Sequence, residues 1–223
     1  MATLEGQTIA GSYKDLLQVS NSNSGVDATA RAVSDGEGTA TLLYVSTTEV
    51  YNPGTGGTSN TAFGKDAGDA LASDGNLNAL FGEGAGTDLT TGVNNVAVGY
   101  HTLFQGTTET DDNVAIGYNA MSGGWTTAVV NDCVVIGSGA GAGALVAGAS
   151  GSTVVGTAAG AAMTSAERST AVGYKALNLL TTGNDNTAIG YEAALGNTAG
   201  GAGAIDHYST TAVGAYAGTA LES

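Results

Sequence analysis

Histidine, the most frequent general base in enzymes, is scarce in this chain of 223 residues. The two histidines, His101 and His207, lie in turn-like segments, and neither has a histidine at the matching place of a related segment. Histidine is the side chain that most often moves a proton in an enzyme. Because no partner is indicated for either histidine, we expect the chain not to be an enzyme and to use no cofactor.

Carboxylates are the next candidates, because hard cations such as Ca²⁺ take about six oxygen ligands. Asp112, Asp132 and Asp185 each lie five residues before a glycine that recurs along the chain, so they could line up. One carboxylate per repeated unit, in units that are not all adjacent, supplies too few ligands. The calcium-binding nonapeptide Gly-Gly-x-Gly-x-Asp is absent from the sequence. We therefore expect solvated turns and no metal site.

Nucleotide-binding and thiol chemistry are not indicated either. Segment 137–143, Gly-Ser-Gly-Ala-Gly-Ala-Gly, resembles a phosphate-binding loop only superficially, because no lysine lies near it. The sequence has no dinucleotide fingerprint and no zinc-ligand spacing. The single cysteine, Cys133, has apolar neighbours, which predicts a buried and inert thiol. One cysteine also excludes a disulfide within the chain.

The charge balance excludes several partners. The chain has 5 Lys and Arg residues against 20 Asp and Glu, a net charge of -15. Nucleic acid binding needs clustered basic residues, so we expect no nucleic acid partner, and anionic membrane surfaces are disfavoured for the same reason. The sequence shows no segment with the length of a membrane span and no signal-peptide pattern at its start. The chain is expected to be soluble, without membrane insertion, and made in the cytoplasm.

Most of these residues lie in a repeated unit that must position them. Its anchor is a glycine that follows a β-branched or aromatic residue and recurs every 17 to 24 residues. The nine anchor glycines are Gly64, Gly82, Gly99, Gly117, Gly137, Gly156, Gly173, Gly190 and Gly214. Alanine stands three residues after the anchor in eight of the nine units, and asparagine stands four residues before it in five. Agreement at several positions predicts a repeat protein.

The residue types of the unit predict a strand followed by a corner. Val, Ile, Phe and Thr before the anchor favour an extended strand, and glycine permits a left-handed or closely packed backbone at the corner. The small residue three positions later lets the next coil or a neighbouring chain approach. The variable stretch that follows, such as 181–185, is rich in turn residues, and longer units are expected to take their extra residues there.

A unit of ~18 residues is too small to bury its own apolar face, so neighbouring units must stack. We predict an all-β fold, a β-solenoid or β-roll rod of about nine coils, with a rise of ~4.8 Å per coil and a length of roughly 40 Å. Its apolar residues are mostly alanine and valine, which predicts a thin core. Acyltransferases built on hexapeptide repeats are the nearest enzymes by geometry, but their aliphatic residue every six positions is not present here.

Three rows of side chains are expected along the rod. The asparagines before the anchor are predicted to form a hydrogen-bonded ladder. Tyrosine follows the anchor in four units, and these pairs are expected to be structural: Gly99 and Tyr100, Gly117 and Tyr118, Gly173 and Tyr174, Gly190 and Tyr191. The tyrosine row is expected to be a packing stripe between coils or chains, with glycan or protein binding as the alternative.

The third row is of threonines three residues before the anchor, as on ice-binding solenoids. It comprises Thr61, Thr153, Thr170, Thr187 and Thr211. The row is interrupted by Ala79, Val96, Val114 and Val134. A continuous ice-binding face is therefore disfavoured, and ice binding stays the least favoured function.

Residues 1–52 do not fit the repeat and are predicted to form a small β-rich module that attaches the rod. Segments 31–34 and 39–45, separated by Asp35 and Gly36, indicate a β-hairpin. Residues 53–59, which contain the only proline, are the expected linker, and residues 60–223 the solenoid domain. The candidate attachment residues are Leu4, Ile9, Tyr13, Lys14, Leu16, Leu17 and Arg31.

Four copies of the repeat carry a resemblance to a known family. They read Asn-Val-Ala-Val-Gly-Tyr-His-Thr-Leu at 95–103, Asn-Val-Ala-Ile-Gly-Tyr-Asn-Ala-Met at 113–121, Ser-Thr-Ala-Val-Gly-Tyr-Lys-Ala-Leu at 169–177 and Asn-Thr-Ala-Ile-Gly-Tyr-Glu-Ala-Ala at 186–194. They resemble a repeat of tailed-phage fibre and virion-surface proteins and, more distantly, the head repeats of trimeric autotransporter adhesins. Segments 4–10, 13–19 and 35–41 are similar to the start of phage fibre-type proteins.

The resemblance implies a homotrimer on the surface of a bacteriophage virion, made in the host cytoplasm and bound to the major capsid protein or another virion protein. The signal peptide and membrane anchor of the autotransporter adhesins have no counterpart in the sequence. A rod of roughly 40 Å is short for a long tail fibre, which favours a capsid decoration (cement) protein or a short spike. The alternative is a tail fibre or adhesin head that binds a host-surface glycan or protein.

Overall fold

The computed structural model describes residues 59–105, 110–124, 129–143, 149–196 and 208–219, with Gly57 and the backbone of four short strands between residues 18 and 51. The chain divides into two compact units, Met1–Gly54 and Thr55–Ser223, and each is described by itself. This division falls within the predicted linker 53–59. Strands, turns and irregular segments account for all the described residues, and none of these residues is helical.

The first unit contains a four-stranded antiparallel sheet. Its strands are β1 (Gln18–Val19), β2 (Arg31–Ser34), β3 (Ala40–Val45) and β4 (Val50–Tyr51), paired in chain order. The predicted hairpin is confirmed, because β2 and β3 pair antiparallel, with a register shift between Ala32 and Ser34. Of the candidate attachment residues, Leu4, Ile9, Tyr13, Lys14, Leu16 and Leu17 lie outside the described residues, and Arg31 is described only by its backbone. Their role in attachment stays a prediction.

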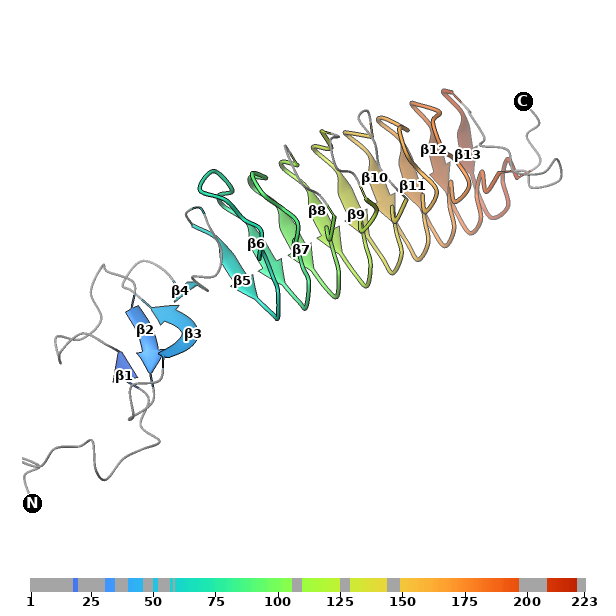
Figure 1. Ribbon diagram of the computed structural model, residues 1–223. Coiled ribbons are helices and arrows are strands. Elements are labelled where there is room, and N and C mark those ends of the chain that lie inside the picture. The colour runs from blue at the N-terminus through green and yellow to red at the C-terminus, as the bar shows by residue number, and fades with distance from the viewer. Residues whose placement is uncertain are drawn as a thin grey trace, which may run out of the picture. The chain divides into compact units, whose positions relative to one another are not determined.

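The second unit is built on a nine-stranded parallel sheet, with one strand from each repeat unit. The strands are β5 (Thr61–Phe63), β6 (Ala79–Phe81), β7 (Val96–Val98), β8 (Val114–Ile116), β9 (Val134–Ile136), β10 (Thr153–Val155), β11 (Thr170–Val172), β12 (Thr187–Ile189) and β13 (Thr211–Val213). They lie side by side in chain order and point the same way (Figure 1). The predicted β-solenoid is confirmed.

The register of the sheet does not depend on the length of the connecting segment. Val114 pairs with Val134 although their unit is 20 residues long, and Thr187 pairs with Thr211 across 24 residues. Because each of strands β5–β13 ends one residue before its anchor glycine, residues that share a repeat position form straight rows along the solenoid. The surface of the solenoid therefore consists of rows of side chains, each row formed by one repeat position.

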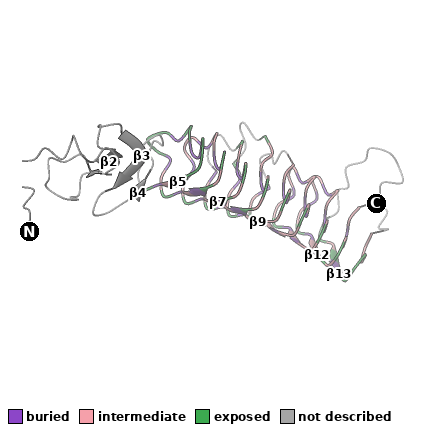
Figure 2. Cartoon of the chain, turned by 90° about the horizontal axis from the view of Figure 1, so that it is seen from below, coloured by how far each residue is buried: buried purple, intermediate pink, exposed green. Residues whose placement is uncertain are grey.

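The core is thin and made mostly of alanine. The middle residue of each strand is buried, as are the alanines three residues after the anchor in all but the last coil, where Ala217 is partly buried. Buried, intermediate and exposed residues alternate within every coil (Figure 2). These alanines had two predicted contacts, the next coil or a neighbouring chain, and the structure places them in the chain's own core. Leu89, Leu103, Met121 and Leu180 fill the remaining width.

The anchor glycines form a row in which backbone packs on backbone. Gly117 has φ +129°, and a Cβ added there would lie 2.7 Å from the carbonyl oxygen of Gly137 in the next coil. No side chain fits in that space, and a φ of this value is essentially restricted to glycine. The predicted close-packed corner is confirmed.

Candidate interaction surface

His101 lies among aromatic rings. Its ring stacks on Tyr100, with 3.8 Å between ring centroids, and on Phe104, with 4.0 Å. His207 lies outside the described residues. Within the ranges that the structure covers, no three His, Cys, Asp or Glu side chains gather into a group that could hold a metal ion.

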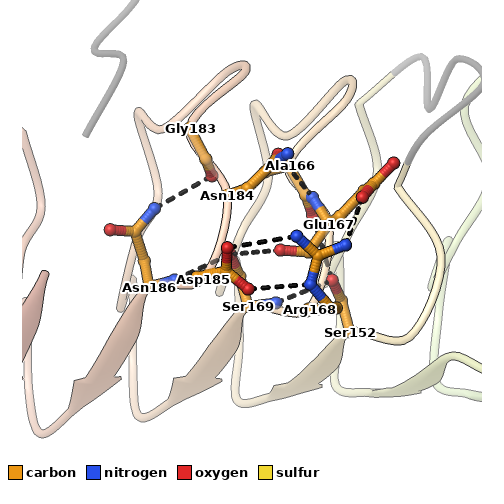
Figure 3. A network of polar contacts seen from close by, with 9 residues as sticks. All are labelled: Ser152, Ala166, Glu167, Arg168, Ser169, Gly183, Asn184, Asp185 and Asn186. Carbon is orange, nitrogen blue, oxygen red and sulfur yellow. Dashed lines mark hydrogen bonds and ion pairs between the residues drawn. The ribbon is translucent and has the colours of Figure 1, made fainter. Parts of the chain in front are cut away.

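The aligned aspartates make contacts between adjacent coils. Arg168 donates from Nε to Asp185 Oδ1 at 2.8 Å and from Nη2 to Asp185 Oδ2 at 3.1 Å, and it also pairs with Glu167 (Figure 3). The hydrogen-bonded Arg168 guanidinium holds the pKa of Asp185 below its usual range. In another pair of coils, Asn94 Nδ2 donates to Asp112 Oδ1 at 3.1 Å. Both aspartates thus join one coil to the next at the surface.

The predicted asparagine ladder is present. Asn95 Nδ2 donates to Asn78 Oδ1 at 3.0 Å, and Asn113 Nδ2 donates to Asn95 Oδ1 at 3.1 Å. The backbone N–H of Asn113 also donates to Asn95 Oδ1 at 3.1 Å. Asn95 Nδ2 makes a further bond of 2.6 Å to the carbonyl of Thr110, three residues before Asn113. These amides are buried and bonded on both atoms, as buried polar groups must be.

Other residue types continue the ladder where asparagine is missing. The backbone N–H of Cys133 donates to Asn113 Oδ1 at 3.0 Å, and that of Ser169 donates to Ser152 Oγ at 3.1 Å. Cys133 Sγ lies 3.3 Å from the carbonyl oxygen of Ala149. The predicted burial of the thiol is confirmed, since Cys133 is 2% exposed, and burial raises its pKa.

A second ladder, which the sequence analysis missed, lies two residues before the first. Here the backbone N–H of one coil donates to a side chain of the next: Val93 to Asp111 Oδ1 at 2.8 Å, and Asp111 to Asn131 Oδ1 at 2.9 Å. Asn131 and Glu167 continue it through Ser150 Oγ and Asn184 Oδ1. Its direction is opposite to that of the asparagine ladder. The polar residues six before the anchor were a signal for it, but their types vary from unit to unit.

The outer surface of the parallel sheet is uncharged and mostly apolar. We define the sheet face as the first and third residues of strands β5–β13, which flank the buried middle residue. These positions hold only Val, Ile, Phe, Thr and Ala, so no charged side chain occurs on the sheet face. Its third-residue row is the more open: Ile116 is 36% exposed and Val213 is 65% exposed. A continuous row of exposed apolar side chains is a feature of interaction sites.

The tyrosines lie next to the sheet face, just past the glycine corner, in two stacks. Tyr100 and Tyr118 stack with 5.4 Å between ring centroids and an interplanar angle of 8°. Tyr174 and Tyr191 stack at 5.2 Å, and Tyr216 meets Tyr191 edge-on. Partial loss of hydration, with the nearby Glu192 carboxylate, raises the pKa of Tyr191 to about 12. The predicted tyrosine row is therefore present as two stacks.

No helix among the described residues is long and apolar enough to cross a membrane. Comparison of the chain with protein-family models, with curated proteins and with solved structures found no match.

Proposed function

We propose that this chain is a non-enzymatic structural protein of a phage virion surface, in which three copies cover one another's sheet faces. The observation that carries the proposal is the sheet face itself, an uncharged surface whose third-residue row is apolar in all nine strands. Burying apolar surface is the main favourable term in association. A surface of this size left in water would promote aggregation instead.

The charge of the chain restricts contact with a second copy to the sheet face. At a net charge of -15, copies of this protein repel one another over most of their surface. The sheet face is where that repulsion is weakest, because it carries no charge. Its rows also run straight for the whole length of the solenoid, and an identical rod has the same length and the same spacing. The number three comes from the resemblance of the repeats to trimeric fibre-type proteins.

The virion assignment rests on the same resemblance and on the length of the rod. Nine strands at ~4.8 Å extend roughly 40 Å, which suits a decoration protein or a short spike more than a long fibre. We propose that residues 1–52 bind the major capsid protein or another virion protein, with the solenoid as the projecting body.

Ice binding is not favoured by the sheet face. Its first-residue row has threonine in β10–β13 without a break, but Ala79 and three valines occupy it from β6 to β9. A flat threonine array would therefore span four strands only. A thermal hysteresis assay of the full chain should give no activity.

Electron microscopy of intact particles tests the virion assignment. Particles would be incubated with a gold-labelled antibody raised against the purified chain. Label on the capsid supports a decoration protein, and label on the tail supports the spike or fibre alternative. Particles that carry the gene but remain unlabelled, while the free chain in the lysate is labelled, would contradict the proposal.

A further inference from the structure

The sheet face changes in composition along the solenoid. In strands β6–β9 the first and third residues are all apolar, and we call these positions the apolar segment: Ala79, Phe81, Val96, Val98, Val114, Ile116, Val134 and Ile136. In strands β10–β13 the first residue is always threonine, and we call the outer positions of these strands the threonine segment: Thr153, Val155, Thr170, Val172, Thr187, Ile189, Thr211 and Val213. Thr61 of β5 borders the apolar segment at its other end.

The hydroxyls of the threonine segment depend on water in the single chain. The threonines of β10–β12 are partly exposed, and that of β13 is exposed. Among the residues with a described side chain, none forms a hydrogen bond with these hydroxyls. A hydroxyl that loses its water without gaining another hydrogen bond is costly to bury. A second copy that covers the threonine segment must therefore leave water there.

The apolar segment can lose its water without that cost. Its first residues are alanine and valine, and they are intermediate in exposure, so covering them buries no polar side chain. Phe81, Ile116 and Ile136 make its third-residue row bulkier than that of the threonine segment, which has one isoleucine and three valines. The larger apolar side chains of these two segments thus lie where no hydroxyl has to stay hydrated.

We infer that the contact between copies has a water-free core on the apolar segment and keeps water on the threonine segment. This inference rests on the proposed assembly through the sheet face and names the part of that face that holds the copies together. An apolar core bordered by polar side chains and trapped water is the usual anatomy of a protein interface. The occupant of the core is the apolar segment of a second copy, which matches it in length, in coil spacing and in lack of charge.

The place of the apolar segment also gives the copies one direction. The segment lies off the centre of the sheet, because one strand precedes it and four strands with threonine follow it. Two copies that run the same way with level ends place apolar segment against apolar segment. If one copy were reversed, β6, β7 and β8 would lie against β12, β11 and β10, and hydroxyls would enter the contact. The parallel arrangement is the one that keeps the core free of water.

Two isosteric substitutions in the full chain test the inference. Val114→Thr adds a hydroxyl to the apolar segment, and Thr187→Val, its matched control, removes one from the threonine segment. Both residues hold the first position of a strand and are intermediate in exposure. The fold accepts either residue there, because threonine holds this position in five strands and valine in three. Association would be measured by fluorescence-detected sedimentation over a dilution series, and circular dichroism would verify the fold of each variant.

We expect Val114→Thr to weaken the association of three copies at least about a hundredfold, because each copy buries a hydroxyl without a hydrogen bond. Thr187→Val should change the association by less than about tenfold, because its surroundings are already hydrated.

Equal weakening by the two variants, weakening by Thr187→Val alone, or no effect of Val114→Thr would each overturn the inference and leave the assembly of three copies in place. An unmodified chain that stays monomeric throughout the dilution series would instead contradict the proposed function. The unmodified chain thus distinguishes failure of the proposed function from failure of this inference.

Discussion

At the scale of the residue, the solenoid depends on buried amides that bond along the stack. Asn95 is fully buried, and its side chain bonds to Asn78, Asn113 and Thr110. A buried amide is costly when unpaired and neutral or favourable when fully paired. The stacking of identical residues gives each asparagine its partners, which explains why the same residue recurs at this position.

Asn95→Ala should destabilise the chain by more than about 2 kcal/mol, because the buried N–H of Asn113 and the buried carbonyl of Thr110 each lose their bond to the Asn95 side chain. Chemical denaturation followed by circular dichroism measures the change in the free energy of unfolding. Asn94→Gly is the matched control: Asn94 is exposed, and Gly151 holds the same place in another unit. An equal loss in the two variants would contradict the ladder's role.

Cys133 offers a second test at this scale. Its thiol is buried, and burial raises its pKa, so the reactive thiolate is scarce in the folded chain. We expect no labelling by a thiol reagent at pH 8 in native buffer and full labelling in denaturant. Native labelling at the rate of a free cysteine would show that the middle of the solenoid is open.

The first ladder could be predicted from the sequence, because asparagine recurs at one spacing from the anchor. The second could not, since Asp111, Asn131 and Ser150 perform one task with three side-chain types. The left-handed backbone conformations of Leu103 and Met121, with φ of +50° and +52°, could not be predicted from the sequence either. Local preference disfavours them by roughly 1–2 kcal/mol each, and burial of both side chains in the core offsets that cost.

At the scale of the element, the anchor glycines let the backbones of adjacent coils pack at the corner at the spacing of the parallel sheet. Strand positions and their stacking could be predicted, because a β-branched or aromatic residue followed by glycine marks the end of each strand. The packing of the alanines three residues after the anchor could not be predicted, because a small residue fits the core of a coil and a contact between chains equally well. The path of the backbone after the glycine corner decides whether these alanines lie in the core or at a contact between chains.

Gly117→Ala should be severely destabilising, because its Cβ would clash with the backbone of Gly137 and its φ of +129° is unsuited to alanine. Gly139→Ala is the control, since its Cβ would meet nothing and only its φ of +65° is unfavourable. We expect a loss of about 1–2 kcal/mol for the control and a much larger loss, or no soluble product, for Gly117→Ala. Expression yield and denaturation midpoints would be compared. Similar behaviour of the two variants would contradict the account of the corner.

At the scale of the whole molecule, a strongly acidic chain has one long surface without charge. A thin coil was expected from the sequence to expose apolar rows, and the structure shows that the residues before the anchor glycines form such a row. The division of each strand into a buried middle residue and two outer residues creates the sheet face. We propose that three copies of the chain assemble through the sheet face.

Ile116→Asp should therefore dissociate the assembly. It places a carboxylate in the middle of the sheet face, where three copies would bring three such charges together. Asn119→Asp, in the turn of the same coil, adds the same charge away from the face and should leave the assembly intact. Circular dichroism would verify that both variants keep the strand content of the original chain. If the native mass of Ile116→Asp equals that of the original chain, the contact between copies does not involve the sheet face.

The native mass of the unmodified chain, measured by light scattering after size exclusion, tests the central claim most directly. We predict a mass near three times 21.6 kDa, stable on dilution and in high salt, since apolar burial rather than charge holds the copies together. A monomer of 21.6 kDa with the folded circular dichroism spectrum would contradict the claim, because the sheet face would then remain uncovered in solution.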